Sequence, residues 1–275
     1  MYLLSIILFI LGLKRLSHPD TAKKGNTIAY IGMGLAIVVT ILFPFEGANN
    51  NYGFIIGGLI LGSIIGFIAA KKVKMTAMPE MVSLFNGLGG ACSLFISLVE
   101  FKNLPPETSL ASTETLTIIF AMVIGGIAFT GSMIAFGKLN GSLRDSLVLP
   151  APQVVNLVLL LAIIGFSAFL MSQDSLDFNY VLILTAITLL YGVTFVTPIG
   201  GGDMPVVISL LNSLSGIAAA GAGLIYGNQV MVVGGILVGA SGTILTVLMC
   251  EAMNRSLFNV IIGGFGTKAA RSGRL

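Results

Sequence analysis

Nine apolar segments, most of them about 20 residues long, follow one another along this chain. They cover residues 2–16, 26–43, 52–70, 79–99, 113–137, 152–171, 179–197, 204–226 and 229–250. A helix needs about 20 mostly apolar residues to cross the hydrocarbon core of a bilayer. Only 9% of the 275 residues are charged, whereas a water-soluble domain carries about 25%. The sequence therefore predicts an all-α membrane protein, a polytopic bundle of about nine transmembrane helices in the lipid bilayer.

The distribution of basic residues predicts how this bundle is oriented. Nine spans place alternate loops on opposite sides of the membrane, and of the 14 basic residues all except Lys102 fall in one set of loops. Lysine and arginine concentrate on the cytoplasmic side of membrane proteins. We therefore expect the C-terminus in the cytoplasm and the N-terminus outside. An eight-span arrangement would mix the two sets of loops, so the charge pattern also favours nine spans.

Two apolar segments carry the same motif and predict an internal repeat. Met, Pro, Ser, Leu, Asn, Leu and Gly recur at the same spacing in residues 78–90 and 204–216. The segments that follow each copy share a Gly-Gly-Ile triplet and a serine, Ser132 in one and Ser241 in the other. Both copies run in the same direction through the membrane. The repeat, which pairs helices four and five with helices eight and nine, is therefore parallel, about an axis along the membrane normal.

The repeat places two amides, Asn86 and Asn212, at one depth. Each lies seven residues beyond a helix-starting proline, about 10 Å into the membrane at 1.5 Å per residue. An amide in hydrocarbon needs a hydrogen-bond partner, and two interpretations stay open. The amides hold helices together, or they line a water-filled path with Ser132 and Ser241. Amides and hydroxyls both donate and accept, so they can order a chain of water molecules, although they do not titrate near neutral pH.

No segment centre contains an ionisable residue, which limits what the chain can do alone. Coupled pumps usually place an ionisable group near the middle of the membrane. The only histidine, His18, lies in a basic loop next to Pro19, where we expect it to be solvated. We therefore expect this chain by itself to lack a complete proton relay, and we expect no metal site.

Two short motifs lie at the predicted cytoplasmic ends of the last helices. Three glycines and Asp203 precede the segment that starts at Met204, and Asn254 and Arg255 follow the last segment. Asp203 fits an acid that complements a helix dipole, and Arg255 fits an interfacial anchor. Both also fit a second interpretation, in which they sense the state of a soluble domain docked on the cytoplasmic side.

Six long stretches are specific enough to suggest a family. They are residues 12–19, 75–86, 129–139, 201–207, 211–220 and 249–256. Together they closely resemble the beta subunit of proton-translocating NAD(P) transhydrogenase, and the resemblance extends from the first helix to Gly266. It implies an enzyme complex that couples hydride transfer between NAD(H) and NADP(H) to proton movement across a bacterial cytoplasmic (inner) membrane.

The resemblance also implies a division of labour between domains. Residues 1–262 are expected to form the transmembrane proton-translocating domain, and residues 263–275 the truncated start of a linker toward a missing NADP(H)-binding domain. NADP(H) and NAD(H) would bind in that domain and in a partner subunit. This chain is therefore expected to bind no cofactor and to catalyse no hydride transfer by itself.

The resemblance assigns roles to single positions. In members of the family, the proton path is associated with the positions that match Asn86, Ser132 and Asn212. Coupling to the NADP(H) domain is associated with the positions that match Asp203, Ser241, Gly242, Asn254 and Arg255.

One departure from the family pattern concerns the partner. Many members have a histidine at the position of Asn86, whereas others have asparagine there and receive a histidine from an alpha-type subunit. We therefore expect alpha-type subunits that supply a channel histidine, a dimer of heteromers, and no nucleic-acid partner.

Two other classes of function remain open from the residues themselves. Parallel repeats, glycine-rich helices and polar amides also fit a secondary transporter or channel for a small solute or ion. A purely structural membrane anchor would explain the glycines but not the paired Asn and Ser residues.

Overall fold

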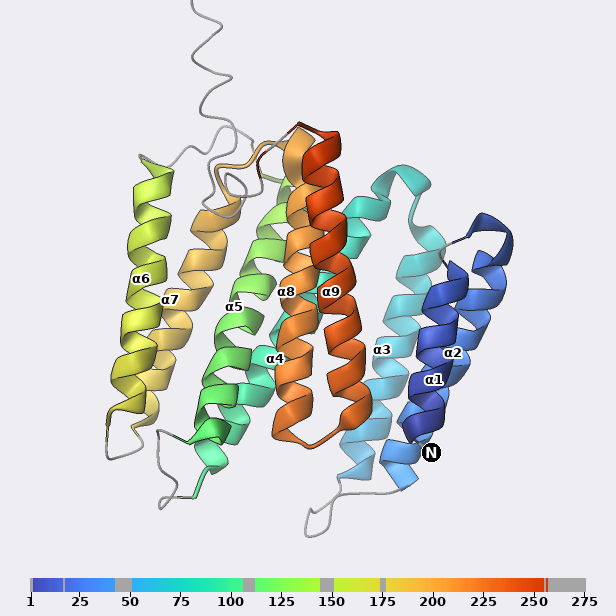
Figure 1. The fold of residues 1–275 in the computed structure, drawn as a ribbon, viewed down its shortest axis with the longest axis horizontal. Helices are drawn as coiled ribbons and strands as arrows, with labels where there is room; N and C mark the ends of the chain where they lie inside the picture. The colour runs from blue at the N-terminus through green and yellow to red at the C-terminus, as the bar shows by residue number, and fades with distance from the viewer. Residues whose placement is uncertain are drawn as a thin grey trace, which may run out of the picture. The chain divides into compact units, whose positions relative to one another are not determined.

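The computed structural model describes residues 2–16, 18–42, 51–105, 112–143, 151–173, 177–254 and 256. All regular structure in this described part is helical (Figure 1), which confirms the predicted all-α class. Eight of the described helices are long and apolar enough to cross a membrane, and the ninth, at the N-terminus, has 15 residues. The chain divides into two compact units, Met1–Met78 and Pro79–Leu275.

The first unit contains a tight helical hairpin. Helices α1 (Tyr2–Leu16) and α2 (Pro19–Leu42) approach each other through glycines, and a Cβ atom on Gly25 would lie 2.8 Å from the Gly12 carbonyl oxygen. The Ser5 hydroxyl donates to the Gly32 carbonyl at 2.5 Å. Small residues let helix backbones come close where hydrophobic burial cannot drive association.

The same unit continues into α3 (Tyr52–Lys72) and the 3₁₀ turn η1 (Met75–Ala77). No residue of α3 is buried, although its span is among the most apolar of the described helices. An apolar helix of this kind is suited to contact with lipid or with other transmembrane helices.

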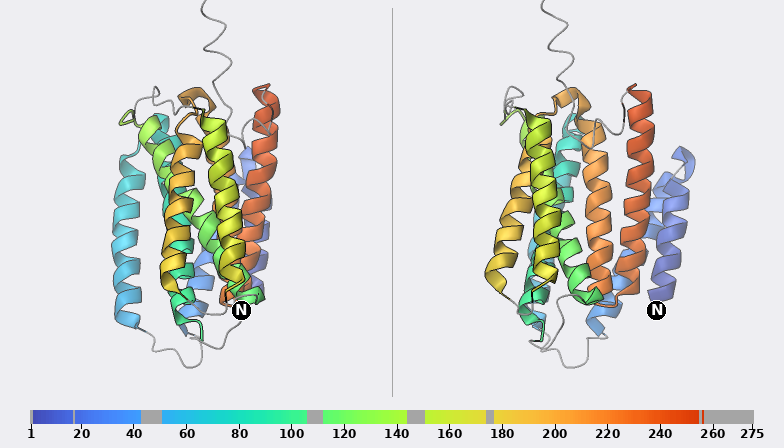
Figure 2. Two further views of the ribbon diagram at one scale, coloured as in Figure 1. Left: turned by 90° about the vertical axis from the view of Figure 1, so that its left-hand side faces the viewer. Right: turned by 60° about the vertical axis from the view of Figure 1, so that its left-hand side comes forward.

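The second unit holds six helices and one 3₁₀ turn. They are α4 (Met78–Asn103), α5 (Thr113–Leu139), α6 (Pro152–Met171), α7 (Phe178–Val196), η2 (Gly201–Asp203), α8 (Met204–Ile225) and α9 (Gln229–Ala252). Helix α5 contacts both α7 and α8, while α6 packs on α7 and α9 packs on α8 (Figure 2). Helix α5 is therefore the central helix of this unit.

Glycines on three sides of α5 explain why it can be central. A Cβ atom on Gly125 would lie 2.9 Å from the Gly90 carbonyl oxygen of α4. One on Gly126 would lie 3.0 Å from the Thr188 hydroxyl of α7, and one on Gly131 would lie 2.9 Å from a methyl group of Leu211 in α8. The absence of side chains at these points lets three neighbours pack directly on the α5 backbone.

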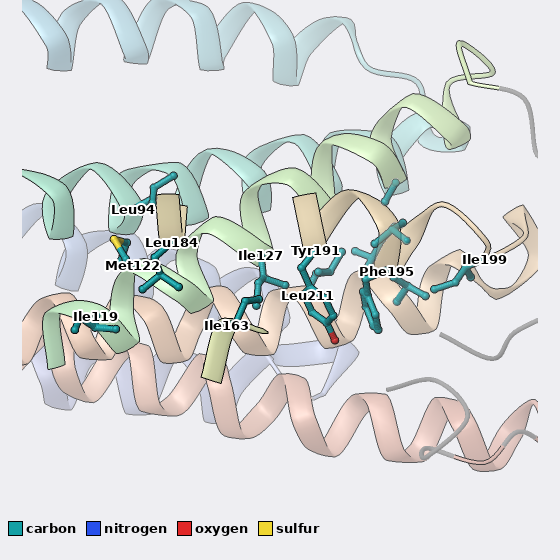
Figure 3. Close-up of a cluster of buried hydrophobic side chains, with 14 of the residues drawn as sticks. Leu94, Ile119, Met122, Ile127, Ile163, Leu184, Tyr191, Phe195, Ile199 and Leu211 are labelled. Carbon is teal, nitrogen blue, oxygen red and sulfur yellow. The ribbon is translucent and has the colours of Figure 1, made fainter. Parts of the chain in front are cut away.

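Apolar side chains fill the remaining space around α5. Met122, Leu184 and Leu211 are completely buried, and Leu94, Met122 and Leu184 gather in one part of this core (Figure 3). The side chains that face outward from α6 are mostly apolar and exposed, as expected for a helix at a lipid boundary.

The helices follow the predicted segments, with different ends in several places. The largest difference is in α2, which begins at Pro19 and not at residue 26. Proline fits the first helical turn, and the polar turns that follow extend the helix beyond its apolar part. Phe43, where this segment was expected to end, lies outside the described residues. The orientation in the membrane stays a prediction.

Candidate functional site

Two helices of the second unit touch backbone to backbone at the predicted polar site. A Cβ atom on Gly90 of α4 would lie 2.8 Å from the carbonyl oxygen of Gly125 in α5. Polar residues that lie one or two helical turns from these glycines, on the same helix faces, therefore come within hydrogen-bond distance of each other. We call this contact between α4 and α5 the first seam.

Asn86 and Ser132 meet in the first seam. The Asn86 amide nitrogen donates to the Ser132 hydroxyl oxygen at 2.8 Å. The Ser83 hydroxyl donates to the Ser132 backbone carbonyl at 2.8 Å. Asn86 is 8% exposed, and both serines are completely buried. Since buried polar groups need partners, these contacts give the two helices a defined register.

Helix α8 adds a residue that the sequence did not reveal. The Ser215 hydroxyl lies within hydrogen-bond distance of the Asn86 amide oxygen and, at 2.9 Å, of the Asn212 backbone carbonyl. Both polar atoms of the Asn86 side chain therefore have partners on other helices. Ser215, Asn86 and Ser132 form one hydrogen-bonded chain across α8, α4 and α5, which we call the polar chain.

The side chain of Asn212 differs from that of Asn86. The Asn212 side chain is half-buried and makes no hydrogen bond to another described residue. Only the backbone carbonyl of Asn212 bonds to the Ser215 hydroxyl. The structure thus brings Asn86 and Ser132 into direct contact, and it brings Asn212 next to them on α8 without a bond between the two amides.

Helices α8 and α9 form a second seam with similar contacts. A Cβ atom on Gly235 would lie 2.7 Å from the Gly216 carbonyl oxygen. The Ser209 hydroxyl donates to the Gly242 carbonyl at 3.1 Å, as Ser83 does to the Ser132 carbonyl in the first seam. By these contacts the counterpart of Ser132 is Gly242.

Ser241 accordingly does not join the second seam. Ser241 is exposed, and its hydroxyl donates to the Val238 carbonyl of its own helix at 3.1 Å. An alignment of the two Gly-Gly-Ile triplets pairs Ser132 with Ser241. The contacts instead pair Ser132 with Gly242, the next residue. Either glycine of such a pair can supply the close approach, so the triplet alone does not fix the register.

Two of the residues expected to couple to another domain, Asp203 and Asn254, lie at one end of α8 and α9, whereas Ser241 and Gly242 lie in the middle of α9. These helices are antiparallel neighbours joined by a turn at Gly227. Asp203 is half-buried in η2 at the start of α8, where its side chain makes no capping hydrogen bond. Asn254 is exposed beyond the end of α9, with a left-handed φ of 51°. Arg255 lies outside the described residues.

A buried lysine holds the connection before Asp203. Lys138, in the last turn of α5, is 7% exposed, and its ammonium donates to the backbone carbonyls of Thr197 and Ile199, the latter at 2.7 Å. The negative end of the α7 dipole favours a cation at this place. From the sequence, Lys138 was expected only in a loop, because the apolar run ends at Gly137.

The opposite ends of α4 and α8 are joined by Glu100 and Tyr226. Burial, followed by a hydrogen bond and charge repulsion from the Glu100 carboxylate, raises the pKa of Tyr226 to about 12. The phenol is protonated at neutral pH and can donate to the carboxylate. These half-buried side chains make a further contact between α8 and α4, in addition to the polar chain.

No group of three or more His, Cys, Asp or Glu side chains that could hold a metal ion is found among the described residues. The polar atoms of the site are amides, hydroxyls and backbone carbonyls. They can donate and accept hydrogen bonds, and they can position water or a partner's side chain.

Comparison with known proteins identifies the family. The model of the NAD(P) transhydrogenase beta subunit family matches residues 1–274. Two curated proteins named NAD(P) transhydrogenase subunit beta, from Rhodospirillum rubrum and from a named strain of that species, are each 39% identical over 275 residues, which cover 97% of this chain. The chain spans 58% of the length of these relatives. It therefore belongs to the NAD(P) transhydrogenase beta-subunit family.

Proposed function

We propose that this chain is the membrane subunit of a proton-translocating NAD(P)⁺ transhydrogenase. It conducts protons across the membrane, coupled to hydride transfer between NADH and NADP⁺ in soluble domains outside residues 1–275. Family membership supports the complex, and the polar chain of Ser215, Asn86 and Ser132 is the observation that supports the route. Residues 1–262 form the translocating domain, and residues 263–275 lead toward the NADP(H)-binding domain.

The chemistry of the polar chain defines what this subunit contributes. Amides and hydroxyls can pass hydrogen bonds and hold water, but they do not store a proton near neutral pH. A titrating group must therefore come from elsewhere, and we assign it to a histidine of an alpha-type subunit. Asn86 and the half-buried Asn212 side chain would position that group or the water next to it.

The end of α8 near Asp203 is the proposed site of coupling. Lys138 fixes the connection that precedes η2, and α8 runs from there to Ser215 as one continuous helix. A docked domain that contacts Asp203, Asn254 or Arg255 could thus shift α8 relative to the seams, with Ser241 on the exposed face and Gly242 in the second seam. Two positions of α8 with different affinity for that domain would couple nucleotide state to proton access.

The cellular setting follows from the same proposal. The described helices make this a multi-pass membrane protein, and we place it in a bacterial cytoplasmic membrane. We propose a dimer of heteromers with alpha-type subunits.

Replacing Asn86 by leucine tests the route. In the assembled complex with the full-length chain, Asn86→Leu removes the bonds to Ser132 and Ser215, and we expect proton translocation and hydride transfer to slow together by roughly tenfold or more, the factor that one buried hydrogen bond is worth. The rates are measured in membrane vesicles with a pH-sensitive dye and by NADPH absorbance.

The control is Asn156→Leu, the same chemical change in α6 of the same unit, away from both seams. It should keep wild-type rates. Wild-type rates in the Asn86→Leu complex would exclude Asn86 from the route. Asn212→Leu is expected to slow both rates as well, because it removes the other amide at this depth.

A further inference from the structure

The Ser215 hydroxyl faces two acceptors with one proton. Its oxygen lies within hydrogen-bond distance of the Asn86 amide oxygen and of the Asn212 carbonyl oxygen. A hydroxyl donates one hydrogen but can accept through two lone pairs. When it donates fully to one of these acceptors, it is therefore free to accept a hydrogen bond from the other side.

This choice has a consequence for the Asn86 amide. While Ser215 donates to the amide oxygen, the amide nitrogen faces Ser132 and donates to its hydroxyl oxygen. If Ser215 donates to the Asn212 carbonyl instead, the amide can turn by about 180°, because its nitrogen and oxygen occupy nearly the same space. The nitrogen then donates to Ser215, and Ser132 donates to the amide oxygen.

Both arrangements satisfy the Asn86 amide without moving the helices. Burial makes them exclusive, since Asn86 is 8% exposed and Ser132 is completely buried, and a half-reversed chain would leave a polar atom without a partner at a high cost in free energy. All hydrogen bonds of the polar chain should therefore reverse together.

We propose that Ser215 is a positioning residue that sets the direction of the Asn86 amide, so that the polar chain alternates between two hydrogen-bond directions. The inference rests on the proposed function and extends it. In one direction Asn86 presents its donor to α5, and in the other it presents its donor to α8. Because Ser215 lies on α8, a shift of α8 that changes the distance to Asn86 selects the direction.

Ser213 provides a matched control on the same helix. It lies two residues away and faces α9, where its hydroxyl donates to the Gly239 carbonyl at 2.8 Å and bonds the Thr243 hydroxyl at 2.6 Å. Ser213→Ala therefore removes a hydroxyl from α8 that is more deeply buried than that of Ser215, without touching the polar chain.

The test uses the assembled complex with the full-length chain, and it compares Ser215→Ala, Ser215→Thr, Ser215→Val and Ser213→Ala. We expect Ser215→Ala and Ser215→Val to slow proton translocation and hydride transfer together by roughly tenfold. Ser215→Thr, which keeps the hydroxyl, should recover most of the rate. Threonine and valine have the same shape, so this pair isolates the hydroxyl even if alanine disturbs assembly.

Three results would overturn the inference. One is a wild-type rate in Ser215→Val when Asn86→Leu is slow, which leaves the proposed route intact. Another is an equal loss in the threonine and valine variants, which would mean that Ser215 acts only through packing. A loss in Ser213→Ala as large as in Ser215→Val would show that any buried hydroxyl of α8 matters equally. A wild-type rate in Asn86→Leu would instead overturn the proposed function itself.

Discussion

Asn86 is the residue on which three helices of the second unit converge. Its amide nitrogen bonds α5 and its amide oxygen bonds α8, so one side chain from α4 defines the spacing of both neighbours. An amide suits this role because it offers a donor and an acceptor at opposite edges of a rigid plane. The same property makes its direction reversible, which a carboxylate or an ammonium could not provide.

Asn156, unlike Asn86, is a buried amide without a hydrogen-bond partner among the described residues. It lies one turn into α6 and is 3% exposed, and neither of its side-chain polar atoms has a hydrogen-bond partner in the described part of the protein. A buried polar group without a partner costs about 1–3 kcal/mol. We therefore expect Asn156→Leu, which keeps the branching of the side-chain heavy atoms, to raise the free energy of unfolding by about 1–2 kcal/mol.

Unfolding can be followed through Cys250, because the protein contains no tryptophan and Cys250 is 2% exposed. In a Cys92→Ser background, a thiol-reactive dye should label Cys250 only as the bundle opens with temperature. A lower labelling temperature in Asn156→Leu than in the parent would mean that Asn156 has a stabilising partner in the membrane.

At the scale of elements, glycine positions decide which helices touch. A Cβ atom on Gly90 would lie 2.7 Å from the Phe129 backbone nitrogen, whereas one on Gly89 would have no neighbour within 4 Å. We expect Gly90→Ala to force α4 away from α5 and to cost about 1–3 kcal/mol of unfolding free energy. Gly89→Ala should be neutral or stabilise by up to about 1 kcal/mol, because alanine favours helix.

The adjacent glycine is thus its own control, and the Cys250 labelling assay can measure both variants. Equal effects of the two substitutions would contradict a direct backbone contact in the first seam. A selective loss of hydride transfer in Gly90→Ala would further connect the seam to the polar chain.

The helices, and the need of the Asn86 amide for a polar partner, could be predicted from the sequence for a physical reason. Long apolar runs have few stable alternatives to a membrane helix, and an amide within such a run requires a polar partner. Ser215 was not predicted as a site residue, because its counterpart in the first copy of the motif is Gly89. A comparison of the two copies therefore does not single it out. The contacts of Lys138 could not be predicted, because its partners are backbone carbonyls, which every residue has and which no sequence pattern distinguishes.

At the scale of the whole molecule, the charge pattern predicts an orientation that labelling can test. In a variant without the two native cysteines, a single cysteine replaces either Lys102 or Lys23, both of which are exposed. A membrane-impermeant thiol reagent added to intact cells should label position 102 and not position 23, because basic residues remain inside. Permeabilised cells should show labelling at both positions, and the reversed pattern in intact cells would refute the predicted topology.

The contact between Lys138 and the α7–η2 connection has a consequence for how this region can vary. The ammonium binds peptide oxygens, which every amino acid possesses, and not the side chains of Thr197 and Ile199. Thr197, which is only half-buried, can accept many substitutions as long as the backbone keeps its path. Ile199 is completely buried in the apolar core, and the single cation has no substitute nearby in the connection itself. The tolerance of this region to mutation should therefore be uneven, with Lys138 and the buried Ile199 intolerant and Thr197 permissive.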